Sequence, residues 1–200
     1  MKHTEQNAKT QATIKQAFIT LIQTKGFSNL TVSDITRQAA VSRGTFYVHY
    51  IDKFDLLQKV EDELYDNLAA TLSTQLDETL NHKSPADKSD ALYSTFTLML
   101  DYVNSERSTL QALFSQNGDP QLFNRIKLLF DEIVSAKLTA YDGHFSTKLP
   151  IDYTKEIALN SMLNIVRYWL NKAEPETTEE IAQILLKSRF LAPHDLLIFE

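Results

Sequence analysis

The chain has 200 residues, of which 43% are hydrophobic and 23% are charged. This composition is typical of a folded protein with a buried core, and it excludes the disordered and fibrous classes. The four Gly and five Pro are too few for an all-β sandwich, which needs turn residues about every ten positions. The absence of Cys excludes disulfides, thiolate zinc sites and a cysteine nucleophile, and it fits a reducing compartment.

Two features of the polar residues bear on location and partners. Residues 1–12 lack the apolar segment of a secretory signal, and no uncharged apolar stretch of about 18 residues follows, so we expect a soluble, cytoplasmic protein without a membrane segment. Residues 1–53 carry seven Lys or Arg against three Asp or Glu, a net charge of +4, whereas residues 54–200 carry −10. A basic head on an acidic body is expected if only the head binds nucleic-acid phosphates.

The pattern of the first 40 residues predicts two helices. Apolar residues within 14–22 recur at the spacing of an amphipathic helix, and Gly26 ends that helix. A short second helix over residues 32–39 begins at Thr31, and Asp34 stands three residues later, as in a capping box.

A third short helix follows after a tight turn. Ala40 and Val41 interrupt the apolar periodicity, and Ser42 is a suitable N-cap for a helix that includes residues 43–47. Two short helices joined in this way predict a helix-turn-helix.

The rest of the chain is helical in period. From Asp52 to Leu80, apolar residues recur every three or four positions, which predicts a helix of about seven turns. Turns that contain Pro or Gly separate the later segments, and none of these alternates like a strand. The sequence therefore predicts an all-α protein with a helix-turn-helix domain over residues 1–54 and a second helical domain over residues 55–200.

The last helices indicate a dimer. Residues 157–170 are apolar around nearly the whole helix and must be covered on most sides, unlike a surface helix of a monomer. Thr177 and Glu180 form a capping box that opens the next helix. We expect the helices near residues 157–172 and 177–190 to form a four-helix seam between two subunits. The apolar segment Leu196 to Phe199 is either docked on the body or exposed.

Three segments within about the first 58 residues together resemble the DNA-binding domain of the tetracycline-repressor (TetR) family. They are Leu30-Thr31-Val32-Ser33-Asp34-Ile35, then Ala39-Ala40-Val41-Ser42-Arg43-Gly44-Thr45-Phe46-Tyr47-Val48-His49-Tyr50, and Asp52-Lys53 with Leu56-Leu57. The resemblance implies a homodimeric, ligand-responsive regulator, a repressor by default, that binds a palindromic operator in double-stranded DNA. Many members have Gly in place of Ala40. Because alanine favours negative φ, we expect a slightly different turn there.

The resemblance also implies which residues meet DNA. The third helix would enter the major groove, where Arg43 contacts either guanine O6 and N7 or a phosphate. Gly44 would let the backbone approach closely, and Thr45 would contact a thymine methyl or a phosphate. Ser42 at the start of this helix belongs to the same candidate set.

The remaining candidates are phosphate contacts. Tyr47 and His49 resemble family residues that bind phosphate oxygens, although Tyr47 could instead fill the core. Lys53 would add a phosphate contact. Thr31 and Ser33 are expected to donate to phosphate at the start of the second helix, and a capping role alone would also explain Thr31.

For the body, the resemblance implies an unknown small-molecule effector. Candidate aromatic residues that would line its pocket, or else form ordinary core, are Phe96, Tyr102, Phe114, Phe130 and Trp169. The sequence Tyr168-Trp169-Leu170, followed by the helix opening at residues 177–184, resembles regulators grouped with the dihydroxyacetone-kinase regulators of the family.

Nothing in the sequence indicates an enzyme. The five His are scattered without metal-ligand spacing, and no nucleophile-elbow sequence is present, so we expect no catalytic residue, no metal site and no cofactor. The alternative function is a partner-dependent coactivator or interaction protein that has lost independent DNA binding.

Overall fold

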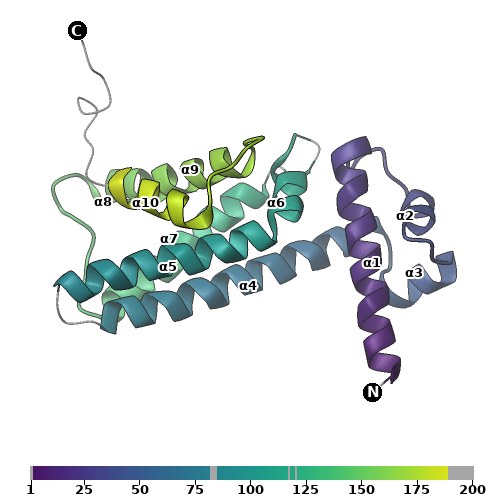
Figure 1. Ribbon diagram of the computed structural model, residues 1–200, viewed down its shortest axis with the longest axis horizontal. Helices are drawn as coiled ribbons and strands as arrows, with labels where there is room; N and C mark the ends of the chain where they lie inside the picture. The colour runs from purple at the N-terminus through teal and green to yellow at the C-terminus, as the bar shows by residue number, and fades with distance from the viewer. Residues whose placement is uncertain (1, 82–84, 117, 120, 189–200) are drawn as a thin grey trace, which may run out of the picture. The chain divides into compact units, whose positions relative to one another are not determined.

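The computed structural model describes residues 2–81, 85–116, 118–119 and 121–188, and within these ranges it contains helices and no strand (Figure 1). The all-α prediction is confirmed. The helices are α1 (Lys2–Lys25), α2 (Val32–Gln38), α3 (Arg43–His49), α4 (Lys53–Asn81), α5 (Pro85–Ser105), α6 (Arg107–Phe114), α7 (Leu122–Ala140), α8 (Ile151–Lys155), the π-helical turn η1 (Glu156–Asn160), α9 (Ser161–Leu170) and α10 (Thr178–Ser188). The apolar segment Leu196 to Phe199 lies outside the described residues.

The chain forms two compact units. The first comprises Met1–Asn67 with Ser108–Asn124, and the second comprises Leu68–Arg107 with Arg125–Glu200. Helix α4 has 29 residues, or about eight turns, and contributes to both units without a break. The expected domains, residues 1–54 with the helix-turn-helix and residues 55–200, stay a prediction.

The first unit is built around the apolar stripe of α1. Ile14, Phe18 and Ile22 are fully buried on this helix, and Phe46 of α3 is fully buried as well. Gly26 ends α1 as expected: its φ is 81°, in the left-handed region, and its N–H donates to the carbonyl of Ile22. Helix α2 packs against both α1 and α3, which holds the predicted helix-turn-helix together.

The turn between α2 and α3 differs from the expectation in one respect. Ala40 does not avoid the left-handed region, since its φ is 52°. The following N–H, that of Val41, donates to the carbonyl of Thr36, which closes the end of α2. The turn therefore keeps a backbone conformation that suits glycine, and the alanine side chain is strained in it.

In the second unit, one arginine holds the carboxyl end of α9. The Arg107 guanidinium lies 4.3 Å from the centre of the Trp169 ring and donates to the carbonyls of Trp169 and Leu170. The indole N–H of Trp169 donates to the Glu176 carbonyl at 2.8 Å, and the ring is 1% exposed. Helix α10 packs along α5 and also contacts α9.

The single chain covers residues 157–170 on one side only, and the expected cover by a second subunit stays a prediction. Leu159, Leu163 and Leu170 are buried, but Ile157 and Tyr168 are 60% and 71% exposed. One side of this helix therefore faces the protein core, while apolar groups on another side stay accessible. Among the described helices, none is long and apolar enough to cross a membrane.

Replacing Ala40 with glycine is expected to stabilise the protein by about 1 kcal/mol, because it removes the strain of a side chain at positive φ. The matched control is Ala39→Gly, whose φ is −78° and whose methyl group is buried. This control should destabilise the protein, since it removes packing and adds chain entropy. Urea unfolding of both variants measures the change in the free energy of unfolding. A lower stability of Ala40→Gly would show that the Ala40 side chain is not strained.

Candidate nucleic-acid interface

Helix α3 starts at a well-formed cap. The Ser42 Oγ accepts a hydrogen bond from the Thr45 N–H at 2.9 Å and lies 2.8 Å from the Thr45 Oγ1. The capping role expected of Ser42 is confirmed. One of the two hydroxyls donates its hydrogen to the other, so only the accepting hydroxyl keeps a hydrogen for a further acceptor.

The buried side of α3 determines which residues face outwards. Phe46 and Tyr50 are 0% and 3% exposed, and their ring centres lie 5.6 Å apart. Tyr47 is 53% exposed, so it lies at the surface rather than in the core. Arg43 is exposed and pairs with no described carboxylate. The guanidinium and the phenol are thus available on the outer side of the helix.

Glycine at position 44 is not required by the fold. It lies exposed in the first turn of α3, and its φ is not positive. A Cβ atom built there would meet only the Ser42 Oγ, at an ordinary 3.6 Å. The fold thus leaves room for a side chain at this position, and its absence fits the close approach to DNA expected for Gly44.

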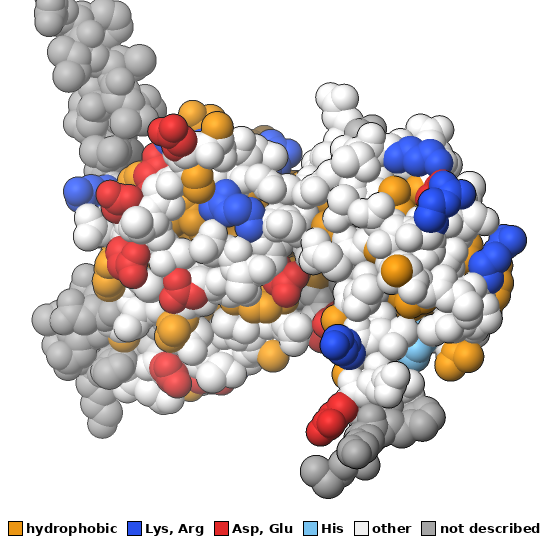
Figure 2. Space-filling view, turned by 45° about the vertical axis from the view of Figure 1, so that its right-hand side comes forward, with side chains coloured by type: hydrophobic (Ala, Val, Ile, Leu, Met, Phe, Trp, Pro, Cys, Tyr) orange, Lys and Arg blue, Asp and Glu red, His pale blue; other side chains and the backbone are white. Residues whose placement is uncertain are grey.

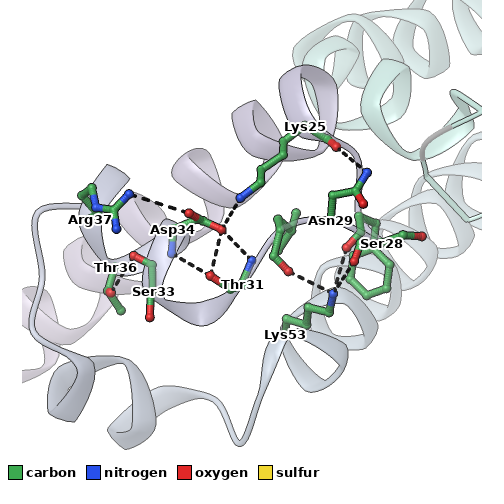
Figure 3. A network of polar contacts seen from close by, with 11 residues as sticks. Lys25, Ser28, Asn29, Thr31, Ser33, Asp34, Thr36, Arg37 and Lys53 are labelled. Atoms are coloured by element: carbon green, nitrogen blue, oxygen red, sulfur yellow. Dashed lines mark hydrogen bonds and ion pairs between the residues drawn. The ribbon is translucent and has the colours of Figure 1, made fainter.

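The start of α2 holds a dense polar network (Figure 3). Thr31 and Asp34 form the capping box predicted from the sequence. Lys25 reaches from the end of α1 to the Asp34 carboxylate at 2.6 Å, and Arg37 lies 3.8 Å from its other oxygen. The hydrogen bond from Lys25, with further ones from Thr31, lowers the pKa of Asp34 to about 2.

This network changes the roles of the two hydroxyls expected to bind phosphate. The Thr31 hydroxyl donates its hydrogen to Asp34 at 2.8 Å, so the capping role accounts for Thr31 and leaves no hydrogen for a phosphate. The Ser33 hydroxyl makes no hydrogen bond to a described residue and remains half-buried. Ser33 is therefore the better donor of the pair.

Lys53 also has a role that the sequence did not reveal. Its ammonium group donates to the carbonyls of Phe27, Ser28 and Leu30 at 3.0, 3.2 and 3.0 Å, and it lies 5.4 Å from the centre of the Phe54 ring. All three N–H groups are used, so a phosphate contact would require their release. In this structure Lys53 instead ties the start of α4 to the loop after α1 (Figure 3).

His49 completes the candidate set. Its ring is half-buried, with its centre 6.2 Å from that of Tyr50, and its carbonyl accepts a hydrogen bond from Lys59. Figure 2 shows Lys and Arg side chains spread over the unit that contains α1, α2 and α3. The surface of this unit thus agrees with the positive charge of residues 1–53.

The aromatic residues predicted for an effector pocket are divided between the two units, and their role stays a prediction. Phe114 belongs to the first unit, where it packs edge-on against Phe123 with ring centres 5.6 Å apart. The other four belong to the second unit, in which Trp169 and Phe130 are buried while Phe96 and Tyr102 are partly exposed. A hollow of about 650 Å³ includes none of the five; it is lined by Tyr168, Asn171, Lys172, Ala173 and Glu174. Among the described residues, no group of three or more His, Asp or Glu is arranged to hold a metal ion.

Two family models together match most of the chain. Residues 16–60 match the model described as bacterial regulatory proteins of the tetR family, and residues 90–189 match the model of a transcriptional regulator C-terminal region. A curated relative, the uncharacterized HTH-type transcriptional regulator YxbF of Bacillus subtilis, is 23% identical over 176 residues. These cover 86% of this chain but 43% of the relative, so the chain spans less than half of that protein.

Solved structures share the fold at low identity. A TetR transcriptional regulator from Streptococcus agalactiae has a TM-score of 0.60 at 23% identity, over 94% of this chain and 97% of that one. NalD of Pseudomonas aeruginosa, the secondary repressor of the MexAB-OprM multidrug efflux pump, has a TM-score of 0.62 at 19% identity, over 93% and 96%. These relatives are transcriptional regulators, not enzymes. The resemblance to dihydroxyacetone-kinase regulators stays a prediction.

Replacing Asp34 with asparagine is expected to lower the melting temperature at pH 7, because Lys25 loses its anionic partner. The pKa of Asp34 is lowered from 3.8 to about 2, so the carboxylate stabilises the fold fully above about pH 4 and loses this effect as the pH falls through about 2. The difference in melting temperature between the two proteins should therefore shrink between pH 4 and pH 2. Asp66→Asn, on the exposed side of α4, is the control and should match the wild type. If the difference in melting temperature between the wild type and Asp34→Asn did not change with pH, this role of the Asp34 carboxylate would be contradicted.

Proposed function

The chain belongs to the TetR family of bacterial transcriptional regulators, and we propose that it is a homodimeric, ligand-responsive repressor that binds a palindromic operator. The observation that carries DNA binding is the outer side of α3, where Arg43 and Gly44 are exposed and Tyr47 is 53% exposed beside its edge-on contact with Phe46. An arginine fork can donate two hydrogen bonds to guanine, and a phenol can bind a phosphate.

The contacts divide into two kinds. Arg43 and Thr45 lie in the first turn of α3 and contact base edges in the major groove. Tyr47, His49 and Ser33 bind phosphates, which sets the position of the helix without reading sequence. Thr31 and Lys53 act indirectly, because their capping and anchoring bonds hold α2 and α4 in place.

The second subunit covers the accessible apolar side of the carboxyl-terminal helices. Ile157 of η1, Tyr168 of α9 and Ile184 of α10 are 60%, 71% and 41% exposed. They fall within the regions 157–172 and 177–190, whose apolar residues favour a four-helix seam. A two-fold dimer of this kind presents two copies of α3 to half-sites roughly 34–36 Å apart.

An effector acts through the second unit. Its aromatic residues Phe96, Tyr102 and Phe130 supply the apolar surface that small-molecule sites use. Helix α4 runs from the DNA-binding unit into this second unit, so a change in the second unit can alter the presentation of α3. Such coupling is typically worth about 1–3 kcal/mol, or roughly 5- to 150-fold in operator affinity. Because an operator is chromosomal DNA, the protein acts in the cytoplasm.

Selection of bound duplexes from a random DNA pool tests this function. We expect an enriched inverted repeat whose measured affinity falls steeply with salt, because phosphate contacts release counterions. Absence of any enriched duplex at low salt would contradict operator binding and favour the interaction protein.

The double variant Arg43→Ala with Tyr47→Ala is expected to lower affinity for the selected duplex by at least about 100-fold, since it removes a base contact and a phosphate contact. Fluorescence anisotropy measures this loss. The matched control is Lys148→Ala with Tyr153→Ala, which removes the same kinds of side chain from exposed positions of the second unit. Equal affinities of the two double variants would show that α3 does not read the operator.

Light scattering of the wild type is expected to give twice the 22.9 kDa of one chain. Tyr168→Glu should shift the protein to the monomer at micromolar concentration, because it places a charge in the covered apolar seam. Tyr153→Glu is the control, since Tyr153 is similarly exposed but lies outside the two seam regions. A wild-type monomer, or a Tyr168→Glu dimer, would contradict the proposed interface.

A further inference from the structure

One exposed apolar residue of α3 has no place in the function described so far. Val48 is 77% exposed, although it stands in the middle of a unit whose other helical valines and leucines are largely buried. The fold gains nothing from it: valine forms helices less readily than alanine, and an exposed valine leaves its methyl groups in water. Its methyl groups are available for contact with a partner molecule.

The helical geometry places Val48 at the outermost point of α3. Successive residues are about 100° apart around an α-helix, so Gly44 and Val48 lie about 160° and 200° from the fully buried Phe46. They straddle the direction opposite the core. Arg43 and Tyr47, at about 60° and 100°, flank this line on one side.

Gly44 and Val48 also lie one turn apart on the same face. Helical side chains lean towards the amino terminus of their helix, so the methyl groups of Val48 extend over the turn that contains Gly44. Gly44 has no side chain, and the space around it is open apart from the Ser42 hydroxyl. The pair therefore forms a small apolar surface. Because no side chain projects from Gly44, a flat partner can come close to the helix backbone there and contact the Val48 methyl groups.

The major groove offers one apolar group, the 5-methyl group of thymine. Valine suits this contact because its branched side chain has one strongly preferred rotamer in a helix, so little conformational entropy is lost on binding. Arginine and tyrosine reach a groove from a distance, whereas valine reaches a base only if the helix lies deep. The absence of a side chain at Gly44 allows that depth.

We propose that Val48 is a specificity-determining residue that reads a thymine methyl group in each operator half-site, an inference that rests on the proposed operator binding. The thymine is the base nearest the outermost point of α3, beside the base that Arg43 contacts. Discrimination here comes from apolar contact, without a hydrogen bond. Replacement of thymine by cytosine or deoxyuridine removes the methyl group and with it the contact.

The test uses the full-length protein and the duplex obtained by selection. Each thymine in the half-sites is replaced, one symmetric pair at a time, by deoxyuridine, which lacks only the methyl group. For one such pair, the wild type should lose about fourfold in affinity per half-site, the factor that corresponds to burial of one methyl-sized group. Val48→Ala should lose affinity for the thymine duplex to a similar extent, and its affinity should be nearly the same for thymine and deoxyuridine.

Two controls separate recognition from folding. Val48→Ala should melt at or above the wild-type temperature, because it removes no buried contact and introduces a better helix former. Ile51→Ala removes an equally exposed apolar side chain, 78% accessible, from the turn after α3. Ile51→Ala should keep the full wild-type sensitivity to deoxyuridine.

The outcomes distinguish this inference from the proposed function. Two outcomes overturn the contact between Val48 and a thymine methyl group but leave operator binding intact. In the first, the protein binds a specific duplex and no deoxyuridine pair lowers its affinity. In the second, Val48→Ala loses as much affinity with deoxyuridine as the wild type does. Failure to bind any specific duplex overturns the proposed function and this inference with it. Loss of the deoxyuridine effect in Val48→Ala, with its retention in Ile51→Ala, supports the inference.

Discussion

Burial of Phe46 is the constraint on which the DNA-binding surface depends. The ring is fully buried in the first unit and packs beside Tyr50, so α3 cannot rotate about its axis without loss of this core contact. The helical repeat then sends Arg43, Gly44, Tyr47 and Val48 outwards. One buried aromatic side chain thus decides the composition of the exposed face.

Much of the polar chemistry near α2 serves the fold itself. Thr31 caps α2, Asp34 binds both Thr31 and Lys25, and Lys53 gives all three of its hydrogens to backbone carbonyls. These bonds satisfy backbone groups at the ends of helices, which would otherwise lack partners. This leaves the residues of α3 and Ser33 as the proposed contacts to a polyanion, while the network holds α2 and the start of α4 in position.

In the second unit, polar groups at the carboxyl end of α9 are satisfied within the chain while apolar surface stays accessible. Arg107 and Trp169 satisfy the carboxyl end of α9 with hydrogen bonds and ring stacking, whereas Ile157 and Tyr168 leave apolar surface accessible. Transfer of apolar groups out of water lowers the free energy. The buried side of this helix therefore stabilises the single chain, and its accessible apolar side favours contact with a further partner. In the proposed dimer, the same segment links the packing of the subunit to its assembly.

By itself, the sequence determined the helices of this protein, the caps of α2, α3 and α10, and its family, because apolar periodicity and capping residues act over a few neighbouring positions. Tertiary structure alone decided where side chains meet residues far along the chain. It joined Lys53 to carbonyls more than twenty positions earlier, placed Tyr47 outside the core and held Ala40 at positive φ. It also left one side of α9 uncovered. Such contacts follow from packing between helices, which a local pattern does not encode.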